Sequence, residues 1–271
     1  MTLPPGERVA AALAAEGRPV PDIVIEPDAD RLARAVAQAL VARLAAAQAV
    51  HGTASVVLTG GGIGIAVLEQ VAALAAEPVR ERVDWTAVEV WWGDERFVPA
   101  DDDERNEKAA RRALLDRVGV PEARIHAMPA SDGELAGPDE AATWYAEELV
   151  AFAAEGRPGP RFDVLLLGMG PEGHVASIFP ESPAATDERP VVAVRDCPKP
   201  PPTRTSLGFS AINTAEEVWL LVAGEAKADA VATALSGAGP VQLPAAGVHG
   251  TRATRWLLDA AAASRLPRTT G

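Results

Sequence analysis

Short apolar segments alternate with helical periodicities along this chain, and the apolar segments have the length of strands rather than of helices. Most are apolar throughout and end in glycine or charged residues, which is typical of strands buried on both faces of a sheet. The predicted strands are PDIVIEPD (21–28), ASVVLTGGG (54–62), VEVWWGDERF (88–97), FDVLLLGMG (162–170), EVWLLVAG (217–224) and TRWLLDAAAA (254–263), the last of which could close the sheet.

Apolar residues between these strands recur every three or four positions, which places them along one face of a helix. Asp28 or Asp30 could cap the start of the first helix. The helices are predicted from Leu32, Val36, Leu40 and Leu44, from Ile65, Leu68 and Val71, over 107–117, from Tyr145, Leu149 and Phe152, and from about residue 225 onward.

Alternation of buried strands with amphipathic helices predicts an α/β fold, with a mainly parallel sheet and helices on both faces. We find no internal repeat and no low-complexity linker in the sequence. The proline-rich segment DCPKPPPTR (196–204) is a candidate boundary, but the pattern continues on both sides of it. We therefore expect a single domain over residues 1–271.

Composition narrows the class of protein. Hydrophobic residues make up 48% of the chain, enough for a large core, and the formal net charge of -13 argues against nucleic acid and anionic membranes as partners. A single cysteine, Cys197, excludes an internal disulfide and a thiolate zinc cluster. Residues 1–19 lack the features of a signal peptide, and no apolar stretch reaches the length of a membrane span. We expect a cytoplasmic protein, monomeric or a small homo-oligomer.

Polar or glycine-rich sequence follows three of the predicted strands: TGGGIG (59–64), GDER (93–96) and GMGPEGH (168–174). Ligands of open parallel sheets bind beyond the carboxyl ends of the strands, so these segments are the candidate site. The first could hold a phosphate on backbone N–H groups at a helix start, or could be only a tight turn. In the second, Arg96 suits an anionic or oxygen-rich ligand, although charges in a loop are commonly solvated ion pairs.

Two further groups of side chains are candidates for chemistry. His174, behind the glycine turn, has an ordinary pKa near ~6.5 and suits a general base at neutral pH. Glu172 could orient it or could be a surface charge. Lys199 and Arg204 flank a stiff proline run and suit a phosphate, with an exposed basic loop as the alternative. Cys197 has no recognisable catalytic context.

Several strings together resemble the 6-phosphogluconolactonase family, in matching order from about Val56 to Pro244. They are WWGDERFVP (91–99), FDVLLLGMGPEGHVASIFP (162–180), PKPPPTRTSLGF (198–209) with Ile212-Asn213, and LLVAGEAKADAV (220–231). The resemblance implies a Rossmann-like fold similar to glucosamine-6-phosphate deaminase and ribose-5-phosphate isomerase. It also implies hydrolysis of 6-phospho-D-glucono-1,5-lactone to 6-phosphogluconate, the second step of the oxidative pentose phosphate pathway, with no redox cofactor and no catalytic metal.

The resemblance also implies roles for particular residues. His174 would take a proton from the attacking water, Arg96 would meet the developing negative charge, and Asp94 could hold Arg96 or a substrate hydroxyl. The remaining residues would bind substrate, with the phosphate on the last two: Thr59, Gly60, Gly61, Gly62, Asn106, Gly170, Glu172, Lys199 and Arg204.

The chain departs from the family pattern at three places. The family's Ser-Gly-Gly-Ser-Thr-Pro loop is Thr59-Gly60-Gly61-Gly62-Ile63-Gly64 here, which removes side-chain contacts but keeps backbone N–H donors. The usual Asp of the Gly-x-Gly-His turn is Glu172, and Arg105 stands where Ser is common.

Two alternatives stay open at this stage. One is an amino-sugar phosphate isomerase-deaminase, but these proteins typically carry Gly-His-Ile-Ala-Phe-Asn-Glu where this chain has GHVASIFP (173–180). The other is a non-catalytic sugar-phosphate-sensing domain, against which stand the acidic charge and the lack of a recognisable DNA-binding segment in the sequence.

Overall fold

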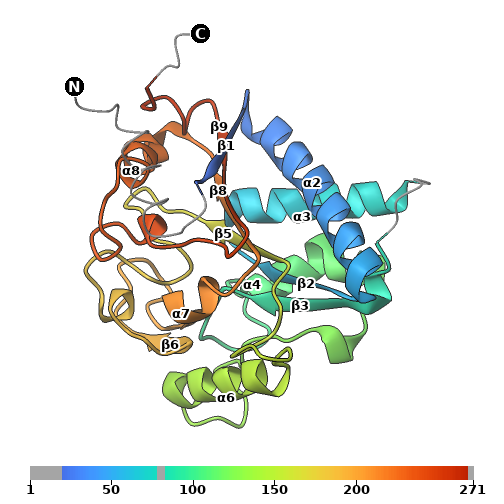
Figure 1. Cartoon of the computed structure of the whole chain (residues 1–271). Coiled ribbons are helices and arrows are strands. Elements are labelled where there is room, and N and C mark those ends of the chain that lie inside the picture. The colour runs from blue at the N-terminus through green and yellow to red at the C-terminus, as the bar shows by residue number, and fades with distance from the viewer. Residues whose placement is uncertain (1–19, 78–82, 268–271) are drawn as a thin grey trace.

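The central sheet is parallel throughout. A computed structural model describes residues 20–77 and 83–267 (Figure 1). The strands lie in the order β1-β9-β8-β5-β2-β3, and every neighbouring pair is parallel. Their bounds are β1 Asp22–Glu26, β2 Ala54–Leu58, β3 Val88–Trp92, β5 Val164–Gly168, β8 Glu217–Val222 and β9 Ala253–Asp259. The predicted parallel sheet is confirmed, although the last strand inserts beside β8 and leaves β1 at the edge. Residues 1–19, considered above for a signal peptide, lie outside the described residues.

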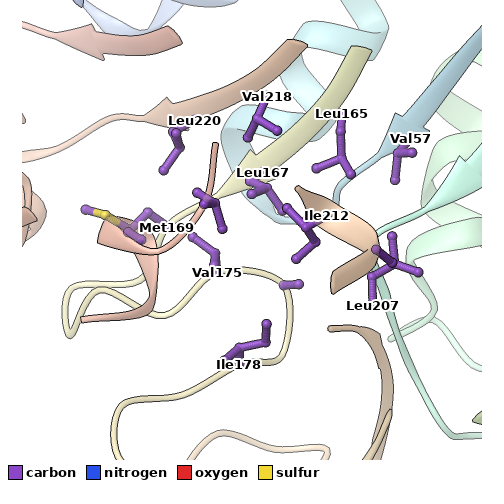
Figure 2. Close-up of a cluster of buried hydrophobic side chains, with 14 of the residues drawn as sticks. Val57, Leu165, Leu167, Met169, Val175, Ile178, Leu207, Ile212, Val218 and Leu220 are labelled. Carbon is purple, nitrogen blue, oxygen red and sulfur yellow. The ribbon is translucent and has the colours of Figure 1, made fainter. Parts of the chain in front are cut away.

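Helices cover both faces of this sheet, as predicted, because alternate strand residues point to opposite sides. Helices α2 (Ala29–His51) and α3 (Gly61–Ala76) pack on one face. The other face carries α6 (Pro138–Ala151), α7 (Phe209–Ile212) and α8 (Ala228–Ala234). Figure 2 shows the core of this second face, where side chains from three strands meet the loop after β5 and the α7 region: Val57, Leu165, Leu167, Val218, Leu220, Val175, Ile178 and Ile212.

The predicted strand over 88–97 is wrong in one respect, because it breaks at Gly93. Beyond this residue the chain leaves the central sheet as β4 (Asp94–Arg96), which pairs antiparallel with β7 (Arg204–Leu207). With β6 (Val191–Val194) these strands form a second, three-stranded sheet in the order β4-β7-β6. Gly93 bridges the two sheets, since its N–H donates to the Leu58 carbonyl at 3.0 Å and its carbonyl accepts from the Leu207 N–H at 2.9 Å.

Three of the helices refine the predictions made from the sequence. The Asp28 side chain caps α2, accepting from the Arg31 N–H at 2.8 Å. The helix expected over 107–117 starts at Asn106 and changes its winding, as α4 (Asn106–Ala110), a π-helical turn η2 (Arg111–Leu115) and α5 (Asp116–Val118). The helix expected from residue 225 begins as a 3₁₀ turn, η5 (Glu225–Lys227), before α8.

The other 3₁₀ turns are η1 Trp85–Ala87, η3 Glu122–Arg124, η4 Pro183–Ala185 and η6 Pro244–Ala246. Among helices of the described ranges, none combines the length and apolarity needed to cross a bilayer.

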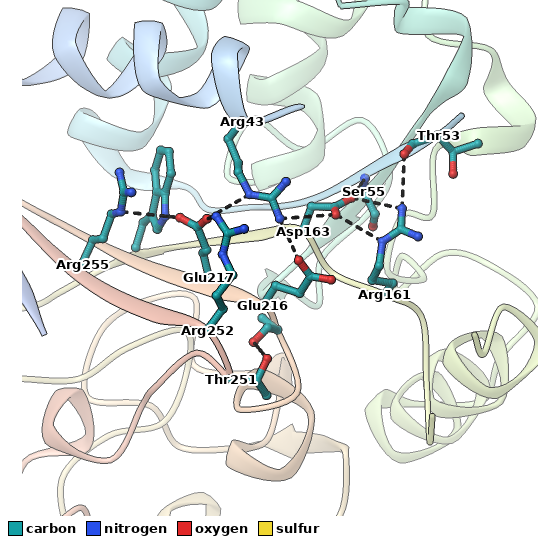
Figure 3. A network of polar contacts seen from close by, with 12 residues as sticks. Arg43, Thr53, Ser55, Arg161, Asp163, Glu216, Glu217, Thr251, Arg252 and Arg255 are labelled. Atoms are coloured by element: carbon teal, nitrogen blue, oxygen red, sulfur yellow. Dashed lines mark hydrogen bonds and ion pairs between the residues drawn. The ribbon is translucent and has the colours of Figure 1, made fainter. Parts of the chain in front are cut away.

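Ion pairs tie together the amino ends of the central strands (Figure 3). Arg43 of α2 reaches Glu216 at 2.7 Å and Glu217 at 2.9 Å, at the start of β8. Its guanidinium also lies 3.6 Å from Asp163, just before β5, and the Asp163 carboxylate accepts the Ser55 N–H of β2 at 2.8 Å. This end of the sheet is therefore closed by charge pairing, and the glycine-rich segments lie at the other end.

Candidate active site

A cavity of about 420 Å³ lies beyond the carboxyl ends of β2, β3, β5 and β8. It forms next to the β2–β5 pair, where the strand order reverses and ligands of open α/β sheets bind. Eleven of the sequence-predicted residues line it: Thr59, Gly60, Gly61, Gly62, Asp94, Arg96, Asn106, Gly170, His174, Lys199 and Arg204. The twelfth, Glu172, contacts two of these, His174 and Lys199. The structure thus brings together residues that are up to 145 positions apart in the chain, from Thr59 to Arg204.

The glycine loop forms the wall of the cavity at the start of α3. The Thr59 hydroxyl accepts the Gly168 N–H at 3.2 Å, which joins the ends of β2 and β5. A Cβ at Gly60 would overlap the Asn106 carboxamide, so the loop and α4 meet only because Gly60 has no side chain. Gly61 has a φ of 79°, a conformation that glycine tolerates. In the described part of the chain no side chain caps α3. The first N–H groups of this helix are therefore suited to an anion.

Glu95 lies in the GDER segment, but sequence reasoning gave it no role, and it supports the site without lining the cavity. Its buried carboxylate accepts three backbone N–H groups, from Arg96 at 2.8 Å, Asn106 at 2.7 Å and Glu107 at 2.9 Å. It thereby fixes the start of α4 against β4 and positions Arg96 and Asn106 at the cavity. Burial raises the pKa of Glu95, and the Arg105 guanidinium 3.8 Å away opposes that rise. Arg105 is thus the buried counter-charge of Glu95, which no local sequence signal indicates.

Asp94 contacts partners other than Arg96, which was one of two partners suggested for it, the other being a substrate hydroxyl. Its carboxylate accepts a 2.6 Å hydrogen bond from the Ser177 hydroxyl and lies 3.9 Å from the Arg204 guanidinium. Arg96 instead donates to the Glu104 carbonyl. The reason is the break at Gly93: β4 pairs with β7, and this register places Asp94 beside the strand that carries Arg204.

His174 is held by the turn that precedes it. The Gly170 N–H donates to the His174 carbonyl at 3.1 Å, and a Cβ at Gly170 would overlap the His174 ring. The ring stacks on Phe179 with centroids 4.5 Å apart, and Nδ1 lies 2.9 Å from Glu172 Oε1. With Nδ1–H donating to this carboxylate, Nε2 carries the free lone pair of a general base.

Burial lowers the pKa of His174 below its ordinary value, and the Lys199 cation lowers it further, whereas the Glu172 carboxylate raises it. The neutral ring therefore predominates at pH 7, as a general base requires. Glu172 is shared, because Lys199 Nζ lies 2.9 Å from its Oε1 and 3.0 Å from its Oε2. The positive charge of Lys199 and the negative charge of Glu172 partly offset each other beside the ring. Burial would raise the pKa of Glu172, but its contacts with Lys199 and His174 outweigh burial and lower this pKa.

Cations gather at this cavity in spite of the acidic chain. Arg204 is buried, and its guanidinium donates to the Pro201 and Lys199 carbonyls, each at 3.1 Å. Lys227, which sequence reasoning missed, also lines the cavity from the turn after β8. Burial lowers its pKa, and the nearby Lys199 cation lowers it further. Its position after a predicted strand was the available signal, although β8 is followed by alanine and glycine rather than by a polar motif.

Comparisons with known proteins point in one direction. The family model "Glucosamine-6-phosphate isomerases/6-phosphogluconolactonase" matches residues 27–256. The 6-phosphogluconolactonase of Mycobacterium tuberculosis is 54% identical over 247 residues, covering 90% of this chain and 98% of that protein. That of Streptomyces coelicolor is 53% identical over 252 residues, covering 92% and 95%.

Solved structures agree with these matches. The 6-phosphogluconolactonase of Thermotoga maritima superposes with a TM-score of 0.76 at 26% identity, covering 88% of this chain and 99% of that one. That of Trypanosoma brucei gives 0.74 at 26% identity, covering 91% and 99%. A monomeric glucosamine-6-phosphate deaminase also superposes, with a TM-score of 0.74 at 18% identity over 90% and 99%, which shows a shared fold alone.

Proposed function

This chain belongs to the family of glucosamine-6-phosphate isomerases and 6-phosphogluconolactonases, and we propose that its activity is the hydrolysis of 6-phospho-D-glucono-1,5-lactone to 6-phosphogluconate. Relatives with more than half of their residues identical over nearly the whole chain carry the lactonase name. One observation of the site carries the chemistry: His174 has Nδ1 on a carboxylate and lies in a cavity lined by cations and helix N–H groups.

His174 acts as the general base. Its Nε2 takes a proton from a water molecule as the water oxygen attacks the lactone carbonyl carbon. The C–O bond to the ring oxygen then breaks, and the protonated imidazole returns its proton to that oxygen as the ring opens. The Arg96 N–H donates to the Glu95 carboxylate, which holds Arg96 in place. The Arg96 guanidinium stabilises the negative charge that develops on the carbonyl oxygen.

The substrate phosphate binds away from the reacting carbon. The N-terminal N–H groups of α3, at Gly60 to Gly62, offer donors that need no side chain, so loss of the family's Ser, Thr and Pro from this loop is tolerated. Lys199 and Lys227 supply positive charge at the same cavity, and buried Arg204 completes it. Binding the phosphate here orients the lactone carbonyl toward His174.

The deaminase alternative is not favoured. The segment GHVASIFP (173–180) lacks the Asn-Glu pair that follows the histidine in those proteins. Ser177 stands in this segment and its hydroxyl is already committed to Asp94 at 2.6 Å. The likeness to the deaminase structure, at 18% identity, extends to the fold alone.

The test measures lactone disappearance at pH 7 with the spontaneous rate subtracted. We expect clear acceleration by the purified protein and a loss of about a hundredfold or more in His174→Ala and His174→Asn, the range of general base catalysis. His51→Ala is the matched control, since His51 lies exposed at the end of α2 and should leave the rate unchanged.

Acceleration that survives in both His174 variants would retain the enzyme and refute the base. A folded protein that binds 6-phosphogluconate without accelerating the reaction would instead support the sensing-domain alternative.

A further inference from the structure

The Glu172 carboxylate joins the candidate base to a candidate phosphate-binding cation. One oxygen, Oε1, lies 2.9 Å from His174 Nδ1 and 2.9 Å from Lys199 Nζ. The other, Oε2, lies 3.0 Å from Nζ. His174 is the more buried of the pair, with 16% of its side chain exposed against 42% for Lys199. An anion entering the cavity can therefore reach Lys199 while the His174–Glu172 contact stays covered.

Charged groups of both signs act on His174. Glu172 and Asp94 favour the protonated ring, and Lys199 disfavours it. Phe179 covers one side of the ring, and the guanidinium of Arg204, on β7, lies 5.9 Å from the centre of the Phe179 ring. Lys227 is subject to the fields of Lys199, Asp259 and Glu172.

We propose that Lys199 and Glu172 form a link through which the substrate's phosphate strengthens His174 as a base, so that the phosphate contributes to the chemical step as well as to binding. The proposal rests on the proposed function above. A phosphate dianion on Lys199 cancels the cation's field at the ring. It also competes for the ammonium hydrogens, so that the Glu172 carboxylate is left to His174 Nδ1.

Both effects act in the same direction. Removing a positive field, and leaving the carboxylate to its ring partner, each favour the imidazolium, so the pKa of His174 rises when the phosphate is bound. A stronger base accepts the proton of the attacking water more readily. A lactone without a phosphate would meet the weaker base of the free enzyme, and discrimination against it would appear in kcat as well as in KM.

Histidine NMR gives a direct test, because the chain has only four histidines to resolve. The His174 signals are assigned by their absence in His174→Asn, and the ring is titrated with and without saturating 6-phosphogluconate. Sulfate is a second probe, since its charge stays constant over the range in which a phosphate monoester titrates. We expect either anion to raise the pKa of His174 by about half a unit or more.

Two lysine variants separate the proposed link from a general effect of charge. In Lys199→Met the pKa of His174 should already be raised in the free protein, and the further rise with 6-phosphogluconate should fall below half of the wild-type rise. Lys227→Met is the matched control: it removes a cation from the same cavity but should leave at least half of the anion-linked rise, measured at saturation.

The proposal is overturned if saturation leaves the pKa of His174 unchanged in the wild type, or if Lys199→Met retains half or more of the rise. It is equally overturned if the rise disappears in Lys227→Met. Lactone hydrolysis is measured on the same samples. Hydrolysis without an NMR shift refutes the link alone, whereas failure both to bind 6-phosphogluconate and to hydrolyse the lactone refutes the proposed function with it.

A kinetic readout supports the titration. The apparent pKa of kcat for 6-phosphogluconolactone should exceed that for glucono-1,5-lactone, and added sulfate should increase kcat for the unphosphorylated lactone. Both effects should be absent in Lys199→Met. Equal apparent pKa values for the two lactones in the wild type would contradict the link.

Discussion

At the scale of single residues, a buried hydroxyl sets the direction in which Asp94 presents its carboxylate. Ser177 has no exposed surface, and its hydroxyl donates to Asp94 at 2.6 Å, while its N–H donates to the Ser206 hydroxyl at 3.1 Å. Asp94 is itself buried, and hydrogen bonds to charged groups are worth more than neutral ones. We therefore expect Ser177 to position Asp94 rather than to act as a nucleophile.

Ser177→Ala should lower both activity and stability, because it removes the hydrogen bond that the Ser177 hydroxyl donates to a buried carboxylate. We expect kcat/KM to fall about tenfold and the free energy of unfolding to fall by about 1–3 kcal/mol. Steady-state kinetics and urea unfolding provide the two measurements.

Ser55→Ala is the matched control for this substitution. Ser55 is also a buried serine on the sheet, but its hydroxyl has no hydrogen-bond partner among the described residues. Its removal should change stability by less than about 0.5 kcal/mol and leave kcat/KM unchanged. Full activity in Ser177→Ala would show that Asp94 does not depend on this contact.

At the scale of elements, the site depends on the close approach of two helix starts. The N-cap of α3 is Gly60, and the first residue of α4 is Asn106. The Asn106 carboxamide lies directly over Gly60 and donates to the Asp94 carbonyl at 2.9 Å. Glu95 holds the same helix start through the Asn106 and Glu107 N–H groups. Loop, helix and β4 thus form one unit, and crowding at one point affects all three.

Gly60→Ala should separate this unit, since the new Cβ would overlap the Asn106 side chain. We expect the free energy of unfolding to fall by about 1–3 kcal/mol, and KM to rise as the loop and Asn106 move. Gly62→Ala is the control for stability, because its Cβ would have no atom within 4 Å. Its melting temperature should equal or exceed that of the wild type. Equal melting temperatures for the two variants would contradict the close approach.

At the scale of the whole molecule, one end of the central sheet carries the candidate site and the other end carries ion pairs that stabilise the fold. The carboxyl ends carry the cavity, and the amino ends carry the ion pairs of Arg43, Asp163, Glu216 and Glu217 (Figure 3). Glu217 has no exposed side-chain surface. Burial alone would raise its pKa, but the hydrogen bond from Trp219 and the surrounding arginines outweigh burial, and the pKa of Glu217 is lowered from 4.5.

Glu217→Gln should therefore destabilise the protein without affecting catalysis. The ionised carboxylate stabilises the fold above its unfolded pKa, near 4.5, and this contribution is lost as pH falls through the lower folded value. We expect the variant to be less stable by about 2 kcal/mol or more at pH 7 and the difference to narrow below pH 4.5. Urea unfolding at several pH values measures this. A difference independent of pH, or a changed kcat at pH 7, would contradict the separation of the two ends.

The sequence alone determined the features that are local in the chain. Apolar runs and helical spacing predicted each strand of the central sheet and the longer helices between them, but not the short α7, because burial on both faces selects wholly apolar strands. The position of His174 just beyond β5 could also be predicted from the sequence, because the glycine turn that places it closes within residues 170–174. Strand ends with unusual polar residues indicated most of the cavity lining, because carboxyl ends of parallel strands meet at one edge.

Tertiary structure decided most of the side-chain partners, whereas the contact of Glu172 with His174, two residues apart, was already suggested by the sequence. Pairing of β4 with β7 depends on a segment about 110 residues further along the chain, and it is this pairing that breaks the strand at Gly93 and brings Arg204 to Asp94. Two further contacts depend on segments that are distant in the chain. Lys199 comes from the segment before β7 to share Glu172 with His174, and Lys227 reaches the cavity from the turn after β8. Local periodicity carries no information about such contacts, since they arise only when the core has packed.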